Sequence, residues 1–433
     1  MAQKKNYYGL TLQDEKNYAA YSVDLAVWKD GIPLKPGQSF PTAEMKQRAD
    51  INKTMDMLVT NQLQEVLDRF INDMPDLNPF QVGRVRDIAA SLPIFDSLVG
   101  TWVAILAPCF QGVKIDGVDR PDIWESVEEN IEDIIRNIFT ACDRALVVNK
   151  HNNVVNTKIY TDKNIILFRT LEDERIVTLT NVITDDDKQW LECLSYHPDG
   201  RCIRDKFRYV NKRIGKHEVV NELVTEDKYI LFAKNGNGRE DYGYPELIGS
   251  VSASLGAIRA FITLSRLTEQ AKDIIKTMPK KAARRDPVTD MTTYIDNGVI
   301  TYDPATAKDQ PHDVSIIKPD IDFEGAIKAL DTMLKQVSIY SHLSGTILGF
   351  EHISGNVSGR LLLASCIPTV LHARGYIKRL SKELKNIVVE VAKYHNIDTD
   401  TTDIELITVG PDQTLVDLLD GVNDDETQEG EQV

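Results

Sequence analysis

The chain has 433 residues and a mass of 48.8 kDa, and this length favours two or three domains. Hydrophobic residues make up 42% of it and charged residues 27%, which excludes a wholly disordered or collagen-like chain. The formal charge of −16 does not exclude DNA as a partner, because 12 acidic and no basic residues follow Ile397, whereas residues 1–397 carry 54 acidic and 50 basic groups.

Cysteines and apolar stretches bear on the compartment. The five cysteines are few, odd in number and scattered, which is typical of a reducing compartment and not of a disulfide scaffold. The N-terminal MAQKKNYYGL has no apolar signal core, and the apolar stretch Val99–Phe110 is shorter than the ~20 residues of a spanning helix. We therefore expect a cytoplasmic protein that has no membrane partner.

Three helical regions are predicted in the front of the chain. Ala43–Asp73 carries apolar residues at spacings of three and four for much of its length. A second region runs from about Pro79 to Phe110 and is broken by Pro93 and Pro108. The third, Trp124–Ala145, is acidic at its start and basic at its end, as the helix dipole favours.

The sequence pattern then changes to one that is typical of β strands. Residues 146–233 form short alternating runs rich in Val, Ile, Thr, Tyr and Phe. Turn clusters lie between or after the runs, among them HPDG at residues 197–200 and NGNG at residues 235–238. This pattern predicts an antiparallel, meandering sheet.

Helical periodicity returns in the second half, around a small β insertion. It runs from Pro245 to Lys276 and again from Asp322 to Leu343. Between these helices, Met278–Pro319 holds five prolines and two strand-like runs, TTYIDNGVITY and HDVSIIK. We expect this insertion to be a small β-containing module.

A glycine-bearing loop and a long helix complete the folded part. The loop is Ser344–Gly359, and the helix runs from about Arg360 to His395, with kinks expected at Pro368 and Gly375. The last stretch, Gly421–Val433, is acidic and has almost no apolar anchor, so we expect it to be disordered.

Nucleotide-binding and nucleophile motifs are weak in this sequence. There is no G-x-x-x-x-G-K-[ST], which argues against a P-loop ATPase. Gly236 and Gly238 form a GxG, but Asp241 stands where the third glycine of a dinucleotide loop belongs, and a hairpin turn is favoured. The eight scattered histidines give no Ser/His/Asp or Cys/His constellation.

Two groups of metal-ligand residue types also have simpler interpretations. Cys193, His197 and Cys202 are three soft ligands, but a structural zinc site needs a fourth, so packed hairpin residues are favoured. Asp185–Asp187 would suit Mg²⁺ only if the carboxylates converged. Consecutive residues on a strand point to opposite faces, so a solvated loop is favoured there.

Basic residues cluster at two places. The ten residues 276–285, where the insertion begins, hold five cations and no acid. The last four cations are Lys280, Lys281, Arg284 and Arg285. On the long helix, a rotation of ~100° per residue brings five cations within an arc of roughly 80°: Arg360, Arg374, Lys378, Lys382 and Lys385. An apolar stripe runs beside them: Leu363, Ile367, Val370, Ile377, Leu384, Val388 and Val391. A solvated loop and an amphipathic surface helix are the simple alternatives.

Several stretches, in this order, resemble the portal proteins of tailed double-stranded DNA bacteriophages. Phe232–Gln270 passes from an apolar strand end through a glycine-rich loop into a long helix, and is similar to the family's entrance to its first stem helix. The proline-rich insertion between two helices is similar to the family's clip. Ser344–Arg360 resembles the loop that, in portals, opens the long helix at the narrowest part of the channel. DIELITVGPD is similar to the strand and turn that close the family's core.

The resemblance covers about residues 80–415 and implies an α+β, portal-like fold with an α/β wing and a minimal crown. It implies the following parts: a wing at 1–244, with a helical front and then an antiparallel β region; a first stem helix at 245–276; a clip at 277–320; a second stem helix at 321–343; a channel loop at 344–359; a long kinked helix and closing strand at 360–410; and an acidic, disordered tail at 411–433.

The resemblance also implies a function in the virion. Portals form a ring, a dodecamer, at one capsid vertex, and they are assembled in the host cytoplasm. They dock the large terminase subunit during genome packaging and then the head–tail adaptor, meet the major capsid or scaffolding protein, and conduct double-stranded DNA without sequence specificity. Such a protein has no catalytic site, cofactor or metal of its own.

The same resemblance assigns roles to particular residues. It implies that the channel is lined by loop residues: Gly345, Gly349, Gly355, Asn356, Ser358 and Gly359. The candidates to face DNA or a partner are the nine cations of the insertion and the long helix. Two other functions stay open. A head-completion or capsid-shell protein would lack the order of helix, β insertion and helix, and a metal-dependent nuclease would need clustered carboxylates.

Overall fold

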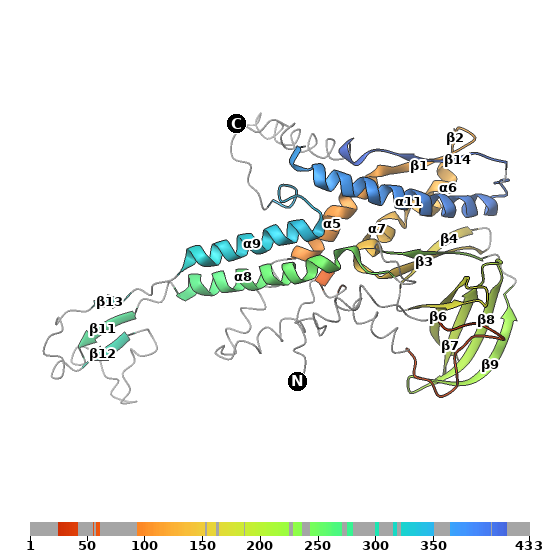
Figure 1. Cartoon of the computed structure of the whole chain (residues 1–433), viewed down its shortest axis with the longest axis horizontal. Coiled ribbons are helices and arrows are strands. Elements are labelled where there is room, and N and C mark those ends of the chain that lie inside the picture. The colour runs from red at the N-terminus through yellow and green to blue at the C-terminus, as the bar shows by residue number, and fades with distance from the viewer. Residues whose placement is uncertain are drawn as a thin grey trace. The chain divides into compact units, whose positions relative to one another are not determined.

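The computed structural model describes residues 25–41, 55, 58–60, 93–151, 154–161, 164–185, 187–224, 228–235, 243–270, 275–279, 299–302, 315–317, 322–349, 364–399 and 401–413 (Figure 1). The chain divides into two compact units. The first comprises Met1–Val251 and Ser338–Val433, and the second comprises Ser252–Val337. The predicted helix Ala43–Asp73 lies almost entirely outside the described residues.

The first unit begins with short helices. They are α5 (Ile94–Leu106), the 3₁₀ turn η1 (Ala107–Cys109), α6 (Pro121–Glu128) and α7 (Ile131–Thr140). The breaks predicted at Pro93 and Pro108 are confirmed, because α5 starts after the first and η1 contains the second. Trp102 of α5 stacks on Phe139 of α7 with their ring centroids 5.4 Å apart.

The single helix predicted over residues 124–145 is wrong. The structure has two helices that meet at Glu129 and Asn130, and strand β3 begins at Asp143. Glu128 and Glu129 place like charges side by side, and asparagine starts helices more readily than it continues them. The residues after Ala141 join a sheet, because pairing with neighbouring strands outweighs their weak helical preference.

The antiparallel β region is confirmed, and it forms two sheets. One has the order β10-β3-β4 and contains β3 (Asp143–His151), β4 (Val154–Thr161) and β10 (Lys228–Lys234). The other is a five-stranded meander of β5 (Ile165–Arg169), β6 (Arg175–Asp185), β7 (Lys188–Tyr196), β8 (Cys202–Val210) and β9 (Arg213–Leu223). The meander carries a separate apolar cluster on each face, one with Phe207 and Trp28 and the other with Leu179 and Val147.

A third sheet joins the C-terminal part of the chain to the front. It has the order β14-β1-β2 and is formed by β1 (Phe110–Ile115), β2 (Val118–Asp119) and β14 (Ile404–Thr408). β14 pairs antiparallel with β1, so the strand predicted within DIELITVGPD is confirmed. The helix before it, α11 (Ile367–Tyr394), packs against α5, α6, β3, β10 and β14.

The kink expected at Pro368 is not found within α11. Pro368 lies in the first turn of the helix, where its missing N–H group costs nothing and its fixed φ suits a helix start. The helix then continues through Gly375. Residues 364–365 are also helical, and a turn at Cys366 separates them from α11.

The second unit contains most of two long helices and a small sheet. Its elements are α8 (Val251–Gln270), which follows the 3₁₀ turn η3 (Glu246–Ser250), then β11 (Ile275–Pro279), β12 (Val299–Tyr302), β13 (Ser315–Ile317) and α9 (Phe323–Ser341). α8 and α9 run side by side, and the sheet lies beyond their ends (Figure 1). A Cβ on Gly256 would meet the Met333 Sδ at 2.8 Å, so a glycine permits the close approach of the two helices.

Most of the predicted order of this region is confirmed, with one correction. The strand-like runs contain β12 and β13, and the second long helix is α9. The first long helix does not reach Lys276, because Lys276 belongs to β11, which pairs with β12 in parallel and with β13 in antiparallel orientation. Strand pairing outweighs the helical periodicity at this end.

One segment, Glu246–Ser265, is long and apolar enough to cross a membrane by length and composition. Its most apolar window has a mean hydropathy of 1.6, and half of that window is buried inside the protein. The core helix of a water-soluble protein meets the same criteria, so one such segment is weak support for a membrane span. Sequence reading overlooked it because serines and glycines interrupt its apolar residues.

Candidate functional site

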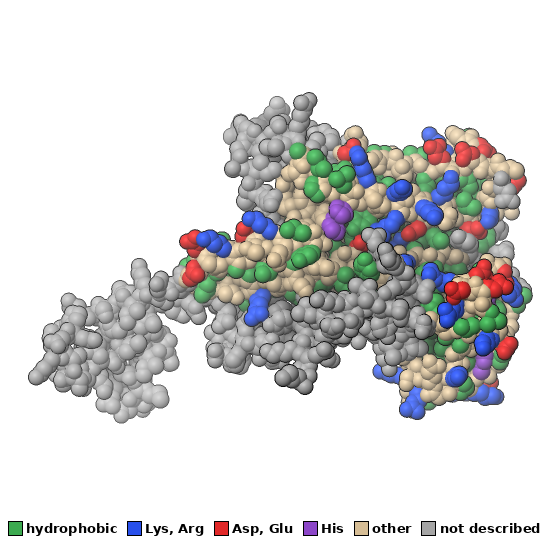
Figure 2. Space-filling view, viewed as in Figure 1, with side chains coloured by type: hydrophobic (Ala, Val, Ile, Leu, Met, Phe, Trp, Pro, Cys, Tyr) green, Lys and Arg blue, Asp and Glu red, His purple; other side chains and the backbone are tan. Residues whose placement is uncertain are grey.

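The candidate surface is the exposed face of α11. Arg374, Lys378, Lys382 and Lys385 are all exposed, and their spacing places them on one side of the helix. Lys and Arg side chains follow this helix in Figure 2. Arg360, the fifth predicted member of this face, lies outside the described residues.

The opposite side of α11 packs into the core. Leu384, Val388 and Val391 are buried, as the predicted stripe requires. Towards the N-terminus the stripe is wrong, because Ile367 is 52% exposed. Tyr376 is buried there instead, with its ring centroid 5.1 Å from that of Trp102. The buried side of this end of the helix is therefore centred on Tyr376 and its aromatic neighbours, and Ile367 faces outward.

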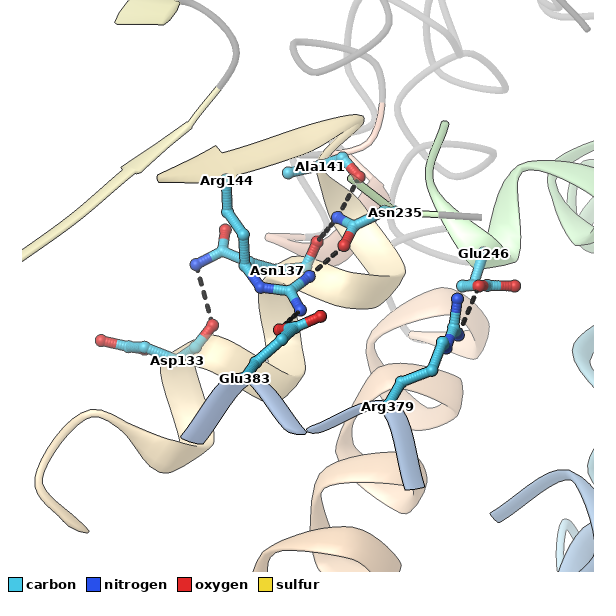
Figure 3. A network of polar contacts seen from close by, with 8 residues as sticks. All are labelled: Asp133, Asn137, Ala141, Arg144, Asn235, Glu246, Arg379 and Glu383. Atoms are coloured by element: carbon cyan, nitrogen blue, oxygen red, sulfur yellow. Dashed lines mark hydrogen bonds and ion pairs between the residues drawn. The ribbon is translucent and has the colours of Figure 1, made fainter. Parts of the chain in front are cut away.

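A buried polar network fixes the position of α11 (Figure 3). Arg144 of β3 is 2% exposed, and its guanidinium donates to the Glu383 carboxylate of α11 and to the Asn235 side-chain oxygen. The Asn235 amide donates to the carbonyls of Asn137 at 2.8 Å and Ala141 at 2.7 Å. A buried ion pair of this kind tolerates little rotation of the helix, because either charge without its partner would be costly.

A second ion pair ties the middle of α11 to the turn before α8. The Arg379 guanidinium lies 2.6 Å from the Glu246 carboxylate of η3 and 5.1 Å from the centre of the Tyr376 ring (Figure 3). Burial raises the pKa of the Tyr376 hydroxyl above its usual range, and the nearby Glu246 charge raises it further. The two networks together determine which side of α11 faces outward.

Sequence reasoning missed this support for the site. Arg144 lies at the start of an apolar strand, and a charged residue in such a place must be paired to be buried. That signal was visible in the sequence. Its partners Asn235 and Glu383 lie 91 and 239 residues away, and no local pattern connects them.

One cation of the exposed face has an acidic partner. Arg374 lies 3.2 Å from Asp412, just after β14, and both side chains are more than half exposed. A backbone hydrogen bond and the Arg374 guanidinium lower the pKa of the Asp412 carboxyl. Lys378, Lys382 and Lys385 have no ion pair within the described part of the chain.

The predicted channel loop is described only at its start. The Ser344 amide donates to the Thr369 hydroxyl of α11 at 2.9 Å, Gly345 is buried, and Gly349 is exposed with a φ of 70°. Four loop residues lie outside the described ranges: Gly355, Asn356, Ser358 and Gly359. Just before the loop, His342 stacks on His372 with ring centroids 3.9 Å apart.

Other predicted site residues are placed apart from this surface or are not described. The insertion's Lys280, Lys281, Arg284 and Arg285, and the GxG residues Gly236 and Gly238 with Asp241, lie outside the described residues. Cys193 and Cys202 belong to the two apolar clusters on opposite faces of the meander, and the HPDG turn joins their strands. The packed-hairpin interpretation of Cys193, His197 and Cys202 is therefore confirmed.

The structure describes two of the three aspartates at the β6–β7 turn. Asp185 and Asp187 are exposed, and Asp185 lies 3.8 Å from the Lys206 ammonium. Asp186 is not described. Across the described ranges, no group of three or more histidine, cysteine or acidic side chains is arranged to hold a metal ion.

The similarity of this chain to known proteins is found among solved structures. No family model matches the chain, and no curated protein matches it. Among solved structures, the chain is similar to one from the neck of an empty GTA particle computed with C6 symmetry, with 12% sequence identity and a TM-score of 0.39. The match covers 76% of this chain and 84% of that chain. A TM-score of this size does not establish a shared fold.

Proposed function

We propose that this chain is the portal protein of a tailed, phage-like particle. It forms a ring at one capsid vertex and serves as the conduit through which DNA is packaged and ejected. The ring is a dodecamer, as the resemblance of its sequence to portal proteins implies. It acts without a catalytic site, metal or cofactor of its own.

The observation that carries the proposal is the order of elements from α8 to β14. Two long helices flank a small three-stranded sheet, and a glycine-bearing loop then leads to a third long helix and a strand that returns to β1. A ring needs head-to-tail contacts between identical chains, and long helices with uncovered apolar side chains suit its walls. Such side chains are at least half exposed on α9 and α11: Ile327, Ile339, Tyr340, Ile367 and Leu371.

The proposed role names the partners of the ring. They are the large terminase subunit during packaging, the head–tail adaptor afterwards, and the major capsid or scaffolding protein around the vertex. DNA passes through the ring without sequence-specific contacts. A near-neutral body suits this passage, because each strong contact with a phosphate would add drag on moving DNA.

The first test is the shape and mass of the purified protein. We expect electron micrographs to show rings with a central hole, and native mass spectrometry at micromolar protein to show one closed oligomer. Monomers and dimers alone, across a range of salt concentrations, would contradict the proposal. A capsid-shell protein or a nuclease would not give a ring with a central hole.

A further inference from the structure

The exposed face of α11 is apolar at the N-terminal end of the helix and basic further along. Ile367 and Leu371, in the first two turns, are 52% and 60% exposed, and Lys378, Lys382 and Lys385 follow on the same side. DNA phosphates gain nothing from aliphatic side chains, whereas a protein partner would bury them and so remove apolar surface from water. The mixed face therefore favours a protein partner over DNA.

A face of opposite charge lies on α6 and α7 of the same unit. Five carboxylates are exposed there, and none has an ion pair within the described part of the chain: Glu125, Glu128, Glu129, Glu132 and Asp133. The dipole of α7 accounts for the last two, which lie in its first turn, but not for the other three. Like charges this close repel one another, and the cations of a partner would relieve that repulsion.

Each charged face points away from the core, and within the described part of the chain no ion pair joins the α11 lysines to these five carboxylates. α6 packs against α11, and the buried side chains of α6 are Ile123, Trp124 and Val127. Its carboxylates lie outside this buried stripe and are exposed. The α11 lysines likewise lie opposite the buried residues of α11.

We propose that the exposed face of α11 docks on the acidic face of α6 and α7 in a second copy of the chain. The α11 lysines meet the neighbour's carboxylates, and the same neighbour covers Ile367 and Leu371. Because two different surfaces of the chain are joined, the contact is heterologous and repeats around a closed ring. This inference rests on the proposed function and names the partner of the α11 face.

Charge swapping tests the contact directly. The first variant carries K378E, K382E and K385E, and the second carries E125K, E128K and E132K. In each, both faces have the same sign, so we expect at least a tenfold loss of ring relative to the wild type by native mass spectrometry at low salt. Two rescues should restore assembly. One chain carrying all six substitutions should form rings, and so should an equimolar mixture of the two variants, with alternating subunits.

Controls separate this contact from general effects of charge and from misfolding. A variant with K188E, R213E and K216E changes the net charge by the same amount as the lysine variant, but on the five-stranded sheet, and should form rings like the wild type. Rescue by mixing also shows that both single-face variants are folded.

Three outcomes would contradict the proposal. If the lysine variant forms rings like the wild type, the α11 face is not this contact. If it forms rings but loses retention of double-stranded DNA, the face binds DNA instead. In both cases the proposed function survives. If the wild type forms no ring at all, the proposed function fails and this inference fails with it.

Discussion

The five-stranded sheet and the α11 helix are both rich in charged side chains, but they differ in how these side chains are paired. On the sheet, cations pair with acids of other strands: Arg204 lies 3.3 Å from Glu192 and 3.5 Å from Glu222, and Lys206 lies 3.8 Å from Asp185. On α11, the inner charges are paired, whereas three outer lysines have no partner within the described residues. A surface that neutralises itself needs no neighbour, and a surface with charge of one sign does. The difference marks α11 as the place to expect an interface.

The largest effect should come from breaking the inner charges of α11. Replacing Arg144 with Met leaves the partly buried Glu383 carboxylate without its cation, and should lower the free energy of unfolding by up to about 3 kcal/mol. Urea unfolding followed by circular dichroism measures this. A double variant, Arg144→Met with Glu383→Leu, should recover part of the loss because no uncompensated charge remains. A single variant as stable as the wild type would show that the ion pair does not hold the helix.

A smaller effect should appear where α9 ends beside α11, and it should depend on pH. Burial lowers the pKa of His342, and the stacked His372 lowers it further, while Glu246 opposes them. Between the folded pKa and the unfolded value of about 6.5, the unfolded chain binds more protons, so stability should fall as pH falls below about 6.5. The urea midpoint should therefore drop less between pH 7 and pH 5 in His342→Gln than in the wild type. Equal drops of the urea midpoint in the two proteins would show that the His342–His372 pair does not cause the pH dependence.

The sheet should tolerate the loss of a surface cation. Arg204→Met removes two partly exposed ion pairs, which are together worth up to about 1 kcal/mol. We expect a small fall in the urea midpoint and unchanged ring formation by native mass spectrometry. A loss of rings would show that the sheet, and not only α11, contacts a neighbouring subunit.

The smallest effect should come from the acidic end of the chain. Truncation after Leu419 removes six acidic residues and no basic ones. The removed segment has few apolar side chains, so their burial could offset little of the entropy lost on ordering it. Melting temperature and ring formation should both stay as in the wild type. A marked fall in melting temperature would mean that this segment docks on the folded body.

Local patterns were enough to predict the elements whose pairing partners are near in sequence. The antiparallel meander follows from alternating runs and turn clusters, and α9 from its helical period. The strand Ile404–Thr408 was also predictable, because it is short, alternating and followed by a Gly-Pro-Asp turn. Its pairing with β1, almost 300 residues away, was not.

The errors have a common physical origin in contacts between distant residues. The first long helix ends before Lys276, because that residue belongs to β11, which pairs with β12 and β13. No local sequence pattern indicates this pairing. In the N-terminal half of α11, the buried side differs from the predicted apolar stripe, because Tyr376 packs against Trp102 and Phe139. For the candidate site, the outward cations were predictable from helical spacing. The buried Arg144 network that orients them joins residues of β3, α7 and α11 with Asn235, which follows β10.

The burial of every cysteine has a practical consequence for chemical labelling. All five thiols are buried, and burial raises the pKa of Cys193 above its usual range, so that little reactive thiolate forms. Thiol reagents should therefore leave the folded wild type almost unmodified. A single cysteine placed at Lys382 would then be the one readily labelled position in an otherwise native chain. A fluorophore or spin label at that position could report the arrival of a neighbouring subunit in real time.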